Sequence, residues 1–547
     1  MLAEVRAGFV GEAIGNLSAL SGVQGCATRV YGVTNSRAWR NTLIIVAATT
    51  ALRLIIGAIV PLFPDETYYW DWSRTLRPGY FDHPPMIAVL VRAGTTLFGA
   101  TPIGVRLFPI LAGTGAALAV SLTARALVDD AAAFTAALIF ACVPLAAAGF
   151  VLATPDAPML CAVSWTMYAT VRALQAAAAD DTRASRIWWA IAGLAIGCAM
   201  ASKYTSVLVP AAIALGCVLH PRLQNRFAEI GPYLAVIIAA AVLAPVLKWN
   251  YQHDWVSFMF QLGHGLGEPK GGLLGVLNRE LQLVGGQIGL VSPILFFFVA
   301  RAIKRSFDST PDGLRLVLGT MAVLPLCFFV YSATRRNVEA NWPAVALIPG
   351  IVLLAVEPPY SWRAKRWFNG GLIFGGVLCA IIYMHVVVPI LPLRADRDQV
   401  AKAFGWNTLG AAIDRRRDFY SSRSLFGRGD LFIAAERYQD ASEIAFHTSG
   451  HPRVFSLNLM GRPNQYDLWV TFPERATPGA SLLLVVDDEI SEPKLIRKLA
   501  CCFTRIDQGE KVAMLRGADP VAKKRLWFLM GWTGEWPVRA QPFPWVD

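Results

Sequence analysis

The stretch FPDETYYWDW, residues 63–72, places two adjacent carboxylates and five aromatic rings directly after a long apolar run. That run begins near residue 41. It is long enough to cross the hydrocarbon core of a bilayer, which is about 30 Å thick and takes about 20 helical residues. Ionisable groups beside lipid are costly unless the protein uses them. The stretch therefore predicts that the chain leaves the membrane near Pro64 and presents Asp65 and Glu66 at its surface.

Apolar runs of similar length recur along most of the chain, which has 547 residues and is 55% hydrophobic and only 16% charged. A soluble domain of this length does not need that composition. The segment 84–99 is apolar but contains Arg92, which predicts an interfacial helix. We predict a polytopic α-helical membrane protein with about eleven transmembrane helices, near residues 41–63, 102–126, 131–150, 156–175, 187–201, 204–220, 231–249, 281–301, 315–332, 340–356 and 368–391.

Lys and Arg concentrate in alternate connections between these runs. Because positively charged loops resist translocation, this pattern places the N-terminus in the cytoplasm. Residues 1–38 are then a cytoplasmic tail, residues 39–391 a transmembrane domain with periplasmic loops, and residues 392–547 a periplasmic part. The basic inner connections largely explain the net charge of +12, so the sequence indicates no nucleic-acid partner.

The last part of the chain alternates short apolar segments with amphipathic ones. Residues 429–450 predict a strand followed by a helix, and PRVFSLNL (452–459) and SLLLVVDD (481–488) predict buried strands. EPKLIRKLACCF (492–503) predicts a second helix. We therefore expect a C-terminal periplasmic α/β domain.

Acidic candidates for chemistry gather in two predicted outer loops. GYFDHPP (79–85) adds Asp82 and His83 to the loop of Asp65 and Glu66, and its prolines restrict the backbone. TPDAP (154–158) adds Asp156. Two structural alternatives stay open, since Asp65 and Asp156 could each cap a helix.

Aromatic and basic candidates lie on the same predicted side. Tyr68 and Tyr69 are candidates for substrate contacts, or else anchors in the aromatic belt of the membrane. Lys203, Arg335 and Arg336 are cations where the orientation rule disfavours them, and such groups suit a phosphate arriving from the lipid phase. The alternatives are a snorkelling lysine and an exposed arginine pair.

Several motifs together resemble the membrane-embedded GT-C glycosyltransferases. They are PDETYYWDWSRTLRPGYFDHPP (64–85), TPDAPML (154–160), GLAIGCAMASKYTSVLVP (193–210) and NWPAVALIPG (341–350). The bacterial aminoarabinose (lipid A) transferases, which belong with the protein O-mannosyltransferases, are the group most similar in these motifs. AERYQDASEIAF (435–446) and RPNQYDLW (462–469) are also similar to bacterial relatives in this superfamily.

The resemblance implies a donor sugar carried on polyprenyl phosphate, such as undecaprenyl phosphate, and sugar transfer at the periplasmic face of the bacterial inner membrane. By position, Asp65 and Asp156 match the acids of the family's first and second outer loops. We expect an inverting transfer to a lipid A, lipopolysaccharide-type or other envelope glycolipid. The alternatives are a protein O-mannosyltransferase-like enzyme acting on Ser or Thr, and a transporter or flippase of lipid-linked sugar.

The chemistry of sugar transfer gives each candidate residue an expected role. Asp65 is the expected general base, Asp156 positions the acceptor or shares the work of the base, and Glu66 orients the donor. Lys203, Arg335 and Arg336 would stabilise the departing phosphate, with His83 as a helper. We predict no cofactor and no protein metal site, although the carboxylates leave a divalent ion open.

The chain departs from the aminoarabinose pattern at two places. Those transferases usually have Arg where this chain has Tyr68, and Glu-Lys where it has Asp82 and His83. Because both changes remove a cation near the donor, specificity for aminoarabinose does not follow.

Overall fold

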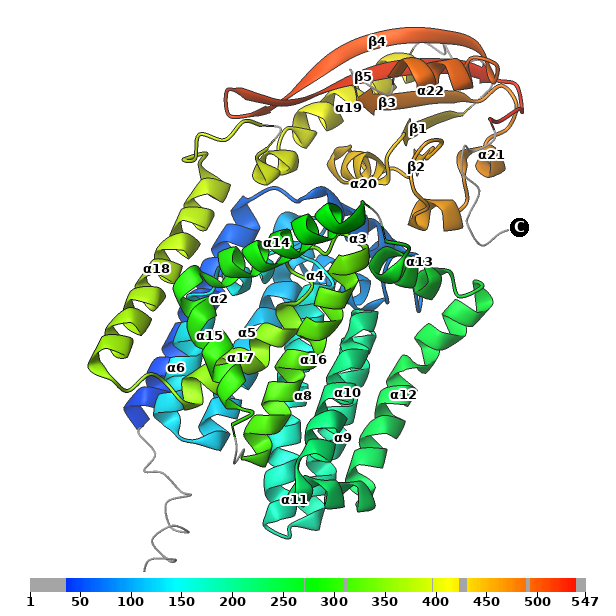
Figure 1. Ribbon diagram of the computed structural model, residues 1–547. Coiled ribbons are helices and arrows are strands. Elements are labelled where there is room, and N and C mark those ends of the chain that lie inside the picture. The colour runs from blue at the N-terminus through cyan, green and yellow to red at the C-terminus, as the bar shows by residue number, and fades with distance from the viewer. Residues whose placement is uncertain are drawn as a thin grey trace, which may run out of the picture.

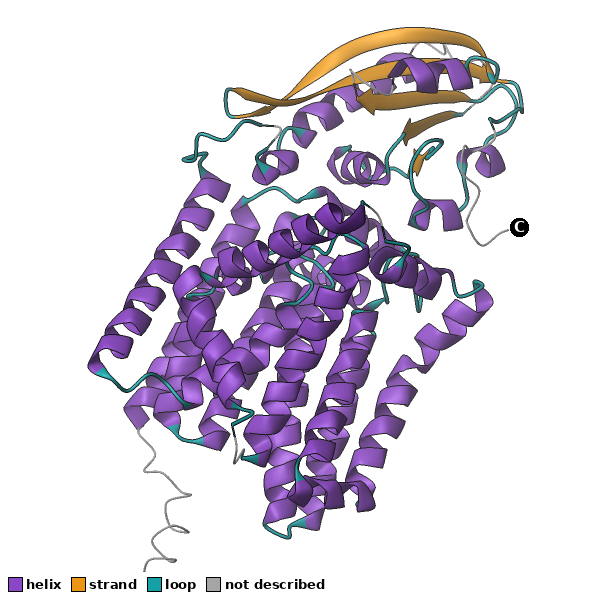
Figure 2. Ribbon diagram, in the orientation of Figure 1, coloured by secondary structure: helices purple, strands orange, loops and turns teal. Residues whose placement is uncertain are grey.

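A computed structural model describes residues 36–269, 271–308, 312–395, 397–422, 430–487 and 492–537. The chain forms a helical body from α2 to α18, and a smaller part with a sheet lies at one end of that body (Figures 1 and 2). Nearly all of the predicted cytoplasmic tail lies outside the described residues.

The helical body begins with α2 (Ser36–Ile59), which is followed by the short α3 (Pro64–Arg74) and α4 (Met86–Phe98). The remaining helices are α5 (Pro102–Leu127), α6 (Asp130–Ala141), α7 (Pro144–Gly149), α8 (Asp156–Ala178), α9 (Thr182–Met200), α10 (Leu208–Leu219), α11 (Pro221–Gln224), α12 (Ile230–Gln252), α13 (Val256–Leu266), α14 (Gly272–Val291), α15 (Pro293–Arg305), α16 (Gly313–Arg335), α17 (Ala344–Val356) and α18 (Trp362–Val387).

The helices confirm a membrane protein but not the number of spans. Among the described residues, five helices are long and apolar enough to cross a membrane, or up to seven if each bent pair forms one span. The count of eleven therefore stays a prediction.

Prolines account for two of the differences from the predicted spans. The run 281–301 is not one helix, because it bends by 104° at Ser292, where φ is 78°. The run 131–150 is likewise split before Pro144, with Val143 extended. A residue that precedes proline avoids the helical region, so each of these helices ends there.

The smaller part contains a five-stranded sheet in the order β2-β1-β3-β5-β4. Its strands are β1 (Leu431–Ala435), β2 (Val454–Ser456), β3 (Ser481–Asp487), β4 (Phe503–Arg516) and β5 (Asp519–Trp532). β1 pairs in parallel with β2 and β3, whereas β5 is antiparallel to β3 and β4. The helices are α19 (Trp406–Ser422), α20 (Tyr438–His447), α21 (Phe472–Arg475) and α22 (Glu492–Leu499). The predicted strands and helices of this part are confirmed.

The acidic helix α3 lies between the two parts. It packs against α20, and the Thr67 and Ser442 hydroxyls are 3.1 Å apart. Tyr466 donates to the Asp71 carboxylate at 2.7 Å. Side chains from both parts, including Trp70, share one buried apolar cluster. The sheet-containing part therefore fixes the helix that carries the first acidic motif.

A second contact ties the sheet-containing part to the end of the helical body. On β4, the buried Arg516 donates to Asp398 at 2.5 Å and also to the backbone carbonyl of His385, at the end of α18. These contacts brace the connection between α18 and α19.

Candidate active site

One cavity of about 740 Å³ lies where the helical body meets the sheet-containing part. Its polar lining comes from α3, the loop after α3, the start of α8 and the segment around Lys203. Gln261, His264, Ser332, Glu339 and Asn341 add further polar groups, and Tyr438 and Arg462 come from the sheet-containing part. The cavity is also lined by apolar side chains, here called the apolar wall, among them Met200, Leu208, Leu243, Phe258, Leu262 and Phe328. The cavity thus combines polar groups with an apolar wall.

Asp65 lines this cavity from the first turn of α3. Its side chain is exposed to the cavity, and no described residue forms a hydrogen bond with its carboxylate. Surrounding protein and, next, the charge of Asp82 raise the pKa of Asp65 above 3.8. The N-cap of α3 is Phe63, so the capping alternative for Asp65 is wrong. An accessible carboxylate with a raised pKa suits proton transfer.

Asp156 lines the same cavity and has two side-chain donors. Lys203 donates to one of its carboxylate oxygens at 2.8 Å and Asn341 donates to the other at 2.8 Å. The ammonium of Lys203 also lies 5.9 Å from the centre of the Trp342 ring. Asp156 is the first residue of α8 and Pro155 is its N-cap, so the capping alternative is wrong here too. The structure therefore brings the second acid and the lysine together.

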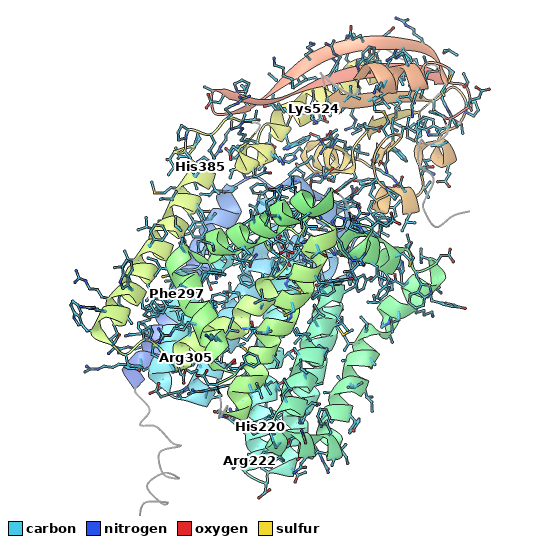
Figure 3. The ribbon with its side chains drawn as sticks, viewed as in Figure 1. His220, Arg222, Phe297, Arg305, His385 and Lys524 are labelled. Atoms are coloured by element: carbon cyan, nitrogen blue, oxygen red, sulfur yellow. The ribbon has the colours of Figure 1, made fainter. Side chains whose placement is uncertain are left out.

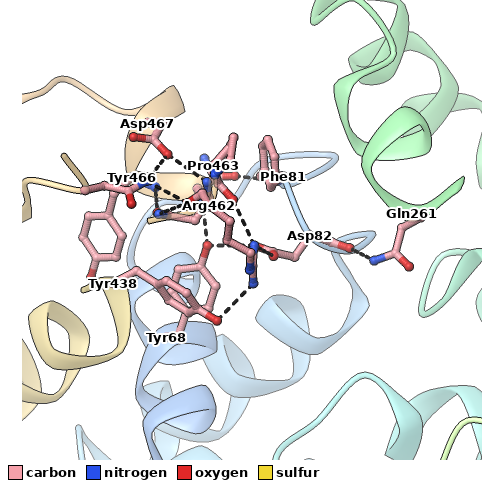
Figure 4. A network of polar contacts seen from close by, with 12 residues as sticks. Tyr68, Phe81, Asp82, Gln261, Tyr438, Arg462, Pro463, Tyr466 and Asp467 are labelled. Atoms are coloured by element: carbon pink, nitrogen blue, oxygen red, sulfur yellow. Dashed lines mark hydrogen bonds and ion pairs between the residues drawn. The ribbon is translucent and has the colours of Figure 1, made fainter. Parts of the chain in front are cut away.

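Asp82 forms the centre of a polar network that joins the two parts of the chain (Figure 4). Tyr68 donates to one carboxylate oxygen at 2.8 Å and Arg462 donates to the other at 2.8 Å. Arg462 also donates to the Tyr438 hydroxyl at 3.0 Å. The backbone N–H of Gln465 donates to the Tyr68 hydroxyl at 2.7 Å. The loop after α3 is thus held by residues almost 400 positions away in the sequence.

His83, the predicted helper, and Tyr69, a candidate for substrate contacts, also line the cavity. Burial, together with the charges of Lys203 and Arg462, lowers the pKa of His83 to about 3. The imidazole is therefore neutral near pH 7. Its Nδ1 is buried and has no hydrogen-bond partner among the described residues. His83 can accordingly serve as a neutral hydrogen-bonding group but not as a cation.

Glu66 does not take the predicted place beside the donor. Its carboxylate is 1% exposed and accepts from Arg106 through Nε at 2.8 Å and Nη2 at 2.5 Å. The backbone N–H groups of Phe63 and Ala153 donate to it at 3.0 and 2.8 Å. Glu66 is absent from the cavity lining. Four donors satisfy its oxygens and Glu66 braces α3 against α5, so the structure does not support the predicted role beside the donor.

Arg335 and Arg336 are also absent from the cavity lining. Arg335 donates to the Tyr331 hydroxyl at 3.0 Å and lies over that ring. Arg336 lies nearer to the cavity. Its guanidinium packs against Gly267, the residue that follows the cavity residues Gly265 and Leu266, so closely that a Cβ there would be only 2.5 Å from Nη2. Burial first, then the charge of Arg462 and, more weakly, that of Arg336, lower the pKa of the cavity residue His264. The two predicted arginines therefore differ in position, and only the Arg336 side chain lies close to a residue that lines the cavity.

Arg462, Tyr438, Asn341 and Trp342 were missed as individual site residues. Each lies within one of the motifs that resemble the GT-C glycosyltransferases, namely NWPAVALIPG, AERYQDASEIAF and RPNQYDLW. The motifs were a usable signal, but the sheet-containing part shows no other mark of a site in its sequence.

The described part of the chain contains no group of three or more His, Cys, Asp or Glu side chains placed to hold a metal ion. Asp65 and Asp82 act on each other electrostatically, but Asp82 is occupied by Tyr68 and Arg462. The structure therefore assigns no residues to the divalent ion that the sequence left open.

Comparisons with known proteins agree with this architecture. Residues 82–249 match the family model described as dolichyl-phosphate-mannose-protein mannosyltransferase. The chain is 30% identical over 369 residues to the lipid A galacturonosyltransferase RgtD of Rhizobium johnstonii. The aligned residues cover 67% of this chain and 75% of that relative. 

Two crystal structures of ArnT from Cupriavidus metallidurans share the fold. The form bound to undecaprenyl phosphate has a TM-score of 0.60 at 16% identity, and the apo form has 0.61 at 17%. Each comparison covers 88% of this chain and 97% of ArnT. The chain therefore belongs to the GT-C superfamily of membrane glycosyltransferases, as its motifs had indicated.

Proposed function

We propose that this protein moves a sugar from a polyprenyl-phosphate donor to lipid A or a similar envelope glycolipid. The observation that carries the proposal is one cavity that holds both an accessible carboxylate, Asp65, and a buried cation, Lys203, next to an apolar wall. The relative from Rhizobium johnstonii is a lipid A glycosyltransferase by name, and ArnT was crystallised with undecaprenyl phosphate.

The proposed reaction is a single displacement at the anomeric carbon. The acceptor hydroxyl attacks this carbon and gives its proton to Asp65. The bond from the carbon to the phosphate oxygen breaks, and the lipid phosphate leaves with the electron pair. The configuration of the anomeric carbon is therefore inverted.

Lys203 is the group best placed to stabilise the leaving phosphate. It is only 6% exposed and lies beside the apolar wall, so its charge acts where little water screens it. Asp156 and Trp342 hold the ammonium in place. In this proposal the lipid chain lies along the apolar side chains, and Asp156 and Asn341 position the acceptor.

The arrangement supports a periplasmic site. Arg222 and Arg305 belong to the basic connections after the predicted runs 204–220 and 281–301, which the charge pattern assigns to the cytoplasm. Both lie towards the end of the helical body remote from the sheet-containing part (Figure 3). The cavity lies at the other end, beside the sheet-containing part. Because basic connections face the cytoplasm, we place the cavity and residues 392–547 in the periplasm of a bacterial inner membrane.

The name of the relative suggests a uronosyl sugar for this chain as well. Mass spectrometry of lipid A from cells with and without the protein tests the function. We expect a hexuronosyl mass increment only where the protein is present. An unchanged lipid A profile contradicts the proposal, whereas label that moves from lipid-linked sugar to membrane proteins favours the protein-acceptor alternative.

The rate of transfer should fall on acidification, because the reaction needs Asp65 as the carboxylate. Burial and the charge of Asp82 raise the pKa of Asp65 above its ordinary value of 3.8. Protonation therefore removes the base at a higher pH than for an aspartate in water. Rates of purified protein with saturating donor, from roughly pH 4 to pH 8, measure this acid limb. An acid limb at the pH of an ordinary aspartate contradicts the role of Asp65.

A further inference from the structure

We propose that Arg462, contributed by the sheet-containing part, determines the specificity for the sugar by binding the carboxylate of a uronosyl donor. This inference rests on the proposed function and adds to it the residue that distinguishes an acidic sugar from a neutral one. It also assigns to the sheet-containing part a direct contact with the substrate.

The hydrogen bonds of Arg462 leave part of its guanidinium available. A guanidinium carries five N–H donors. Nη1 donates to Asp82 at 2.8 Å and to the Pro463 carbonyl at 2.9 Å, and Nη2 donates to Tyr438 at 3.0 Å. Nε–H and one N–H of Nη2 have no acceptor among the described residues. Nε and Nη2 are neighbouring nitrogens of the guanidinium, and a carboxylate can accept from the N–H groups that remain there.

Arg462 is held firmly but is not enclosed. Its guanidinium lies 5.0 Å from the centres of both the Phe260 and the Tyr438 rings. Its side chain remains 42% exposed and lines the cavity. Although burial acts in the other direction, the Asp82 carboxylate raises the pKa of Arg462, so the side chain stays charged. A fixed cation that faces the cavity can receive an anionic ligand group without reorganising.

The position of Arg462 favours the sugar over the lipid phosphate as its ligand. Its partners come from the loop after α3 and from the sheet-containing part, and its charge acts on Asp65, beside which the anomeric carbon reacts. Lys203 instead bonds to Asp156 and lies near the Trp342 ring, and in our proposal it receives the lipid phosphate. The two cations therefore serve two different anionic groups.

The departures from the aminoarabinose pattern support the same assignment. Asp82 bonds to Arg462 directly, and Tyr68 donates to Asp82. The backbone of Gln465, three residues after Arg462, donates in turn to Tyr68. Tyr68 and Asp82, two positions at which the chain departs from the aminoarabinose pattern, thus hold the side chain of Arg462 in place (Figure 4). A change of sugar accompanied by a change at these positions is the result that a specificity site should give.

The test compares two donors that share the lipid phosphate and differ only in the carboxylate. Purified wild-type and Arg462→Gln proteins are supplied with galacturonosyl- or galactosyl-undecaprenyl phosphate and with lipid A as the acceptor. We expect kcat/KM for the galacturonosyl donor to fall about 10- to 100-fold, with little change for the galactosyl donor. Arg462→Lys should recover part of the loss because it keeps the charge but not the paired donors.

Four other results of this experiment would overturn the inference. An equal loss with both donors means that Arg462 binds the phosphate or only stabilises the fold, and it overturns the inference, as does unchanged selectivity. Wild-type protein that prefers the galactosyl donor also overturns it. Wild-type protein that transfers neither sugar overturns the proposed function together with the inference.

Two further variants serve as a matched control and as an alternative to Arg462→Gln. Arg453→Gln is the matched control, because Arg453 donates to the Val470 carbonyl outside the cavity and should leave selectivity unchanged. If Arg462→Gln fails to fold, Tyr438→Phe removes one acceptor that holds the guanidinium. It should lower selectivity for the galacturonosyl donor in the same direction, and a folded Tyr438→Phe protein with unchanged selectivity counts against the inference.

Discussion

Replacing Asp65 with Asn should reduce sugar transfer by about 10²- to 10⁴-fold, the usual contribution of a general base. The substitution keeps the size of the side chain but removes its capacity to accept a proton. No described residue bonds to the Asp65 carboxylate, so the substitution breaks no contact there and should leave the fold intact. Transfer from a labelled lipid-linked sugar to lipid A, measured on purified protein, gives the rate.

Asp254→Asn provides a matched control for this experiment. Asp254 is exposed, lies outside the cavity lining and has φ 51°, a conformation that Asn adopts readily. This control should keep the wild-type rate. If the Asp65→Asn protein is folded and transfers sugar at the normal rate, Asp65 is not the base.

Replacing Glu66 with Gln should destabilise the protein by about 3–5 kcal/mol, the usual cost of removing one partner of a buried ion pair. Glu66 and Arg106 have side chains 1% and 0% exposed, and two hydrogen bonds join them. Gln preserves the shape but leaves the Arg106 charge uncompensated in a region that water does not reach. Unfolding in detergent micelles, followed by tryptophan fluorescence, measures the loss.

Glu510→Gln is the surface counterpart of that substitution. Glu510 pairs with Arg416 at 2.8 Å, but the two side chains are 36% and 34% exposed. Solvent screens this pair, so its loss should cost at most about 1 kcal/mol. Equal effects of the two substitutions would show that the Glu66 pair does not stabilise the fold as the structure indicates.

Much of the fold could be predicted because membrane helices and buried strands leave strong periodic signals. The apolar segments around β1 and β3 and the amphipathic α20 are examples. The hairpin of β4 and β5 was not predicted, because only part of its length is buried and charged residues interrupt its apolar pattern. The broken helices were missed because hydropathy does not register a single proline.

The candidate site was predicted from types of residue and their predicted side of the membrane, and the structure brings Asp65, Asp156 and Lys203 into one cavity. The sequence did not predict the direction in which each side chain points. Asp65 and Glu66 are neighbours in the sequence, so residue type and predicted side of the membrane do not distinguish them. Consecutive residues of a helix point in different directions, so one lines the cavity and the other faces Arg106. Arg462 was missed because only the folded chain brings residues 82 and 462 within bonding distance.

The position of α3 between the two parts has a consequence for biosynthesis. The helix emerges early from the ribosome, yet Thr67, Tyr68 and Asp71 bond to residues that are translated nearly 400 positions later. A nascent chain that ends after α18 therefore still lacks the residues that bond to α3, the helix that carries Asp65. We therefore expect a chain that ends after α18 to be inactive even if it inserts, because it lacks the residues that bond to Thr67, Tyr68 and Asp71.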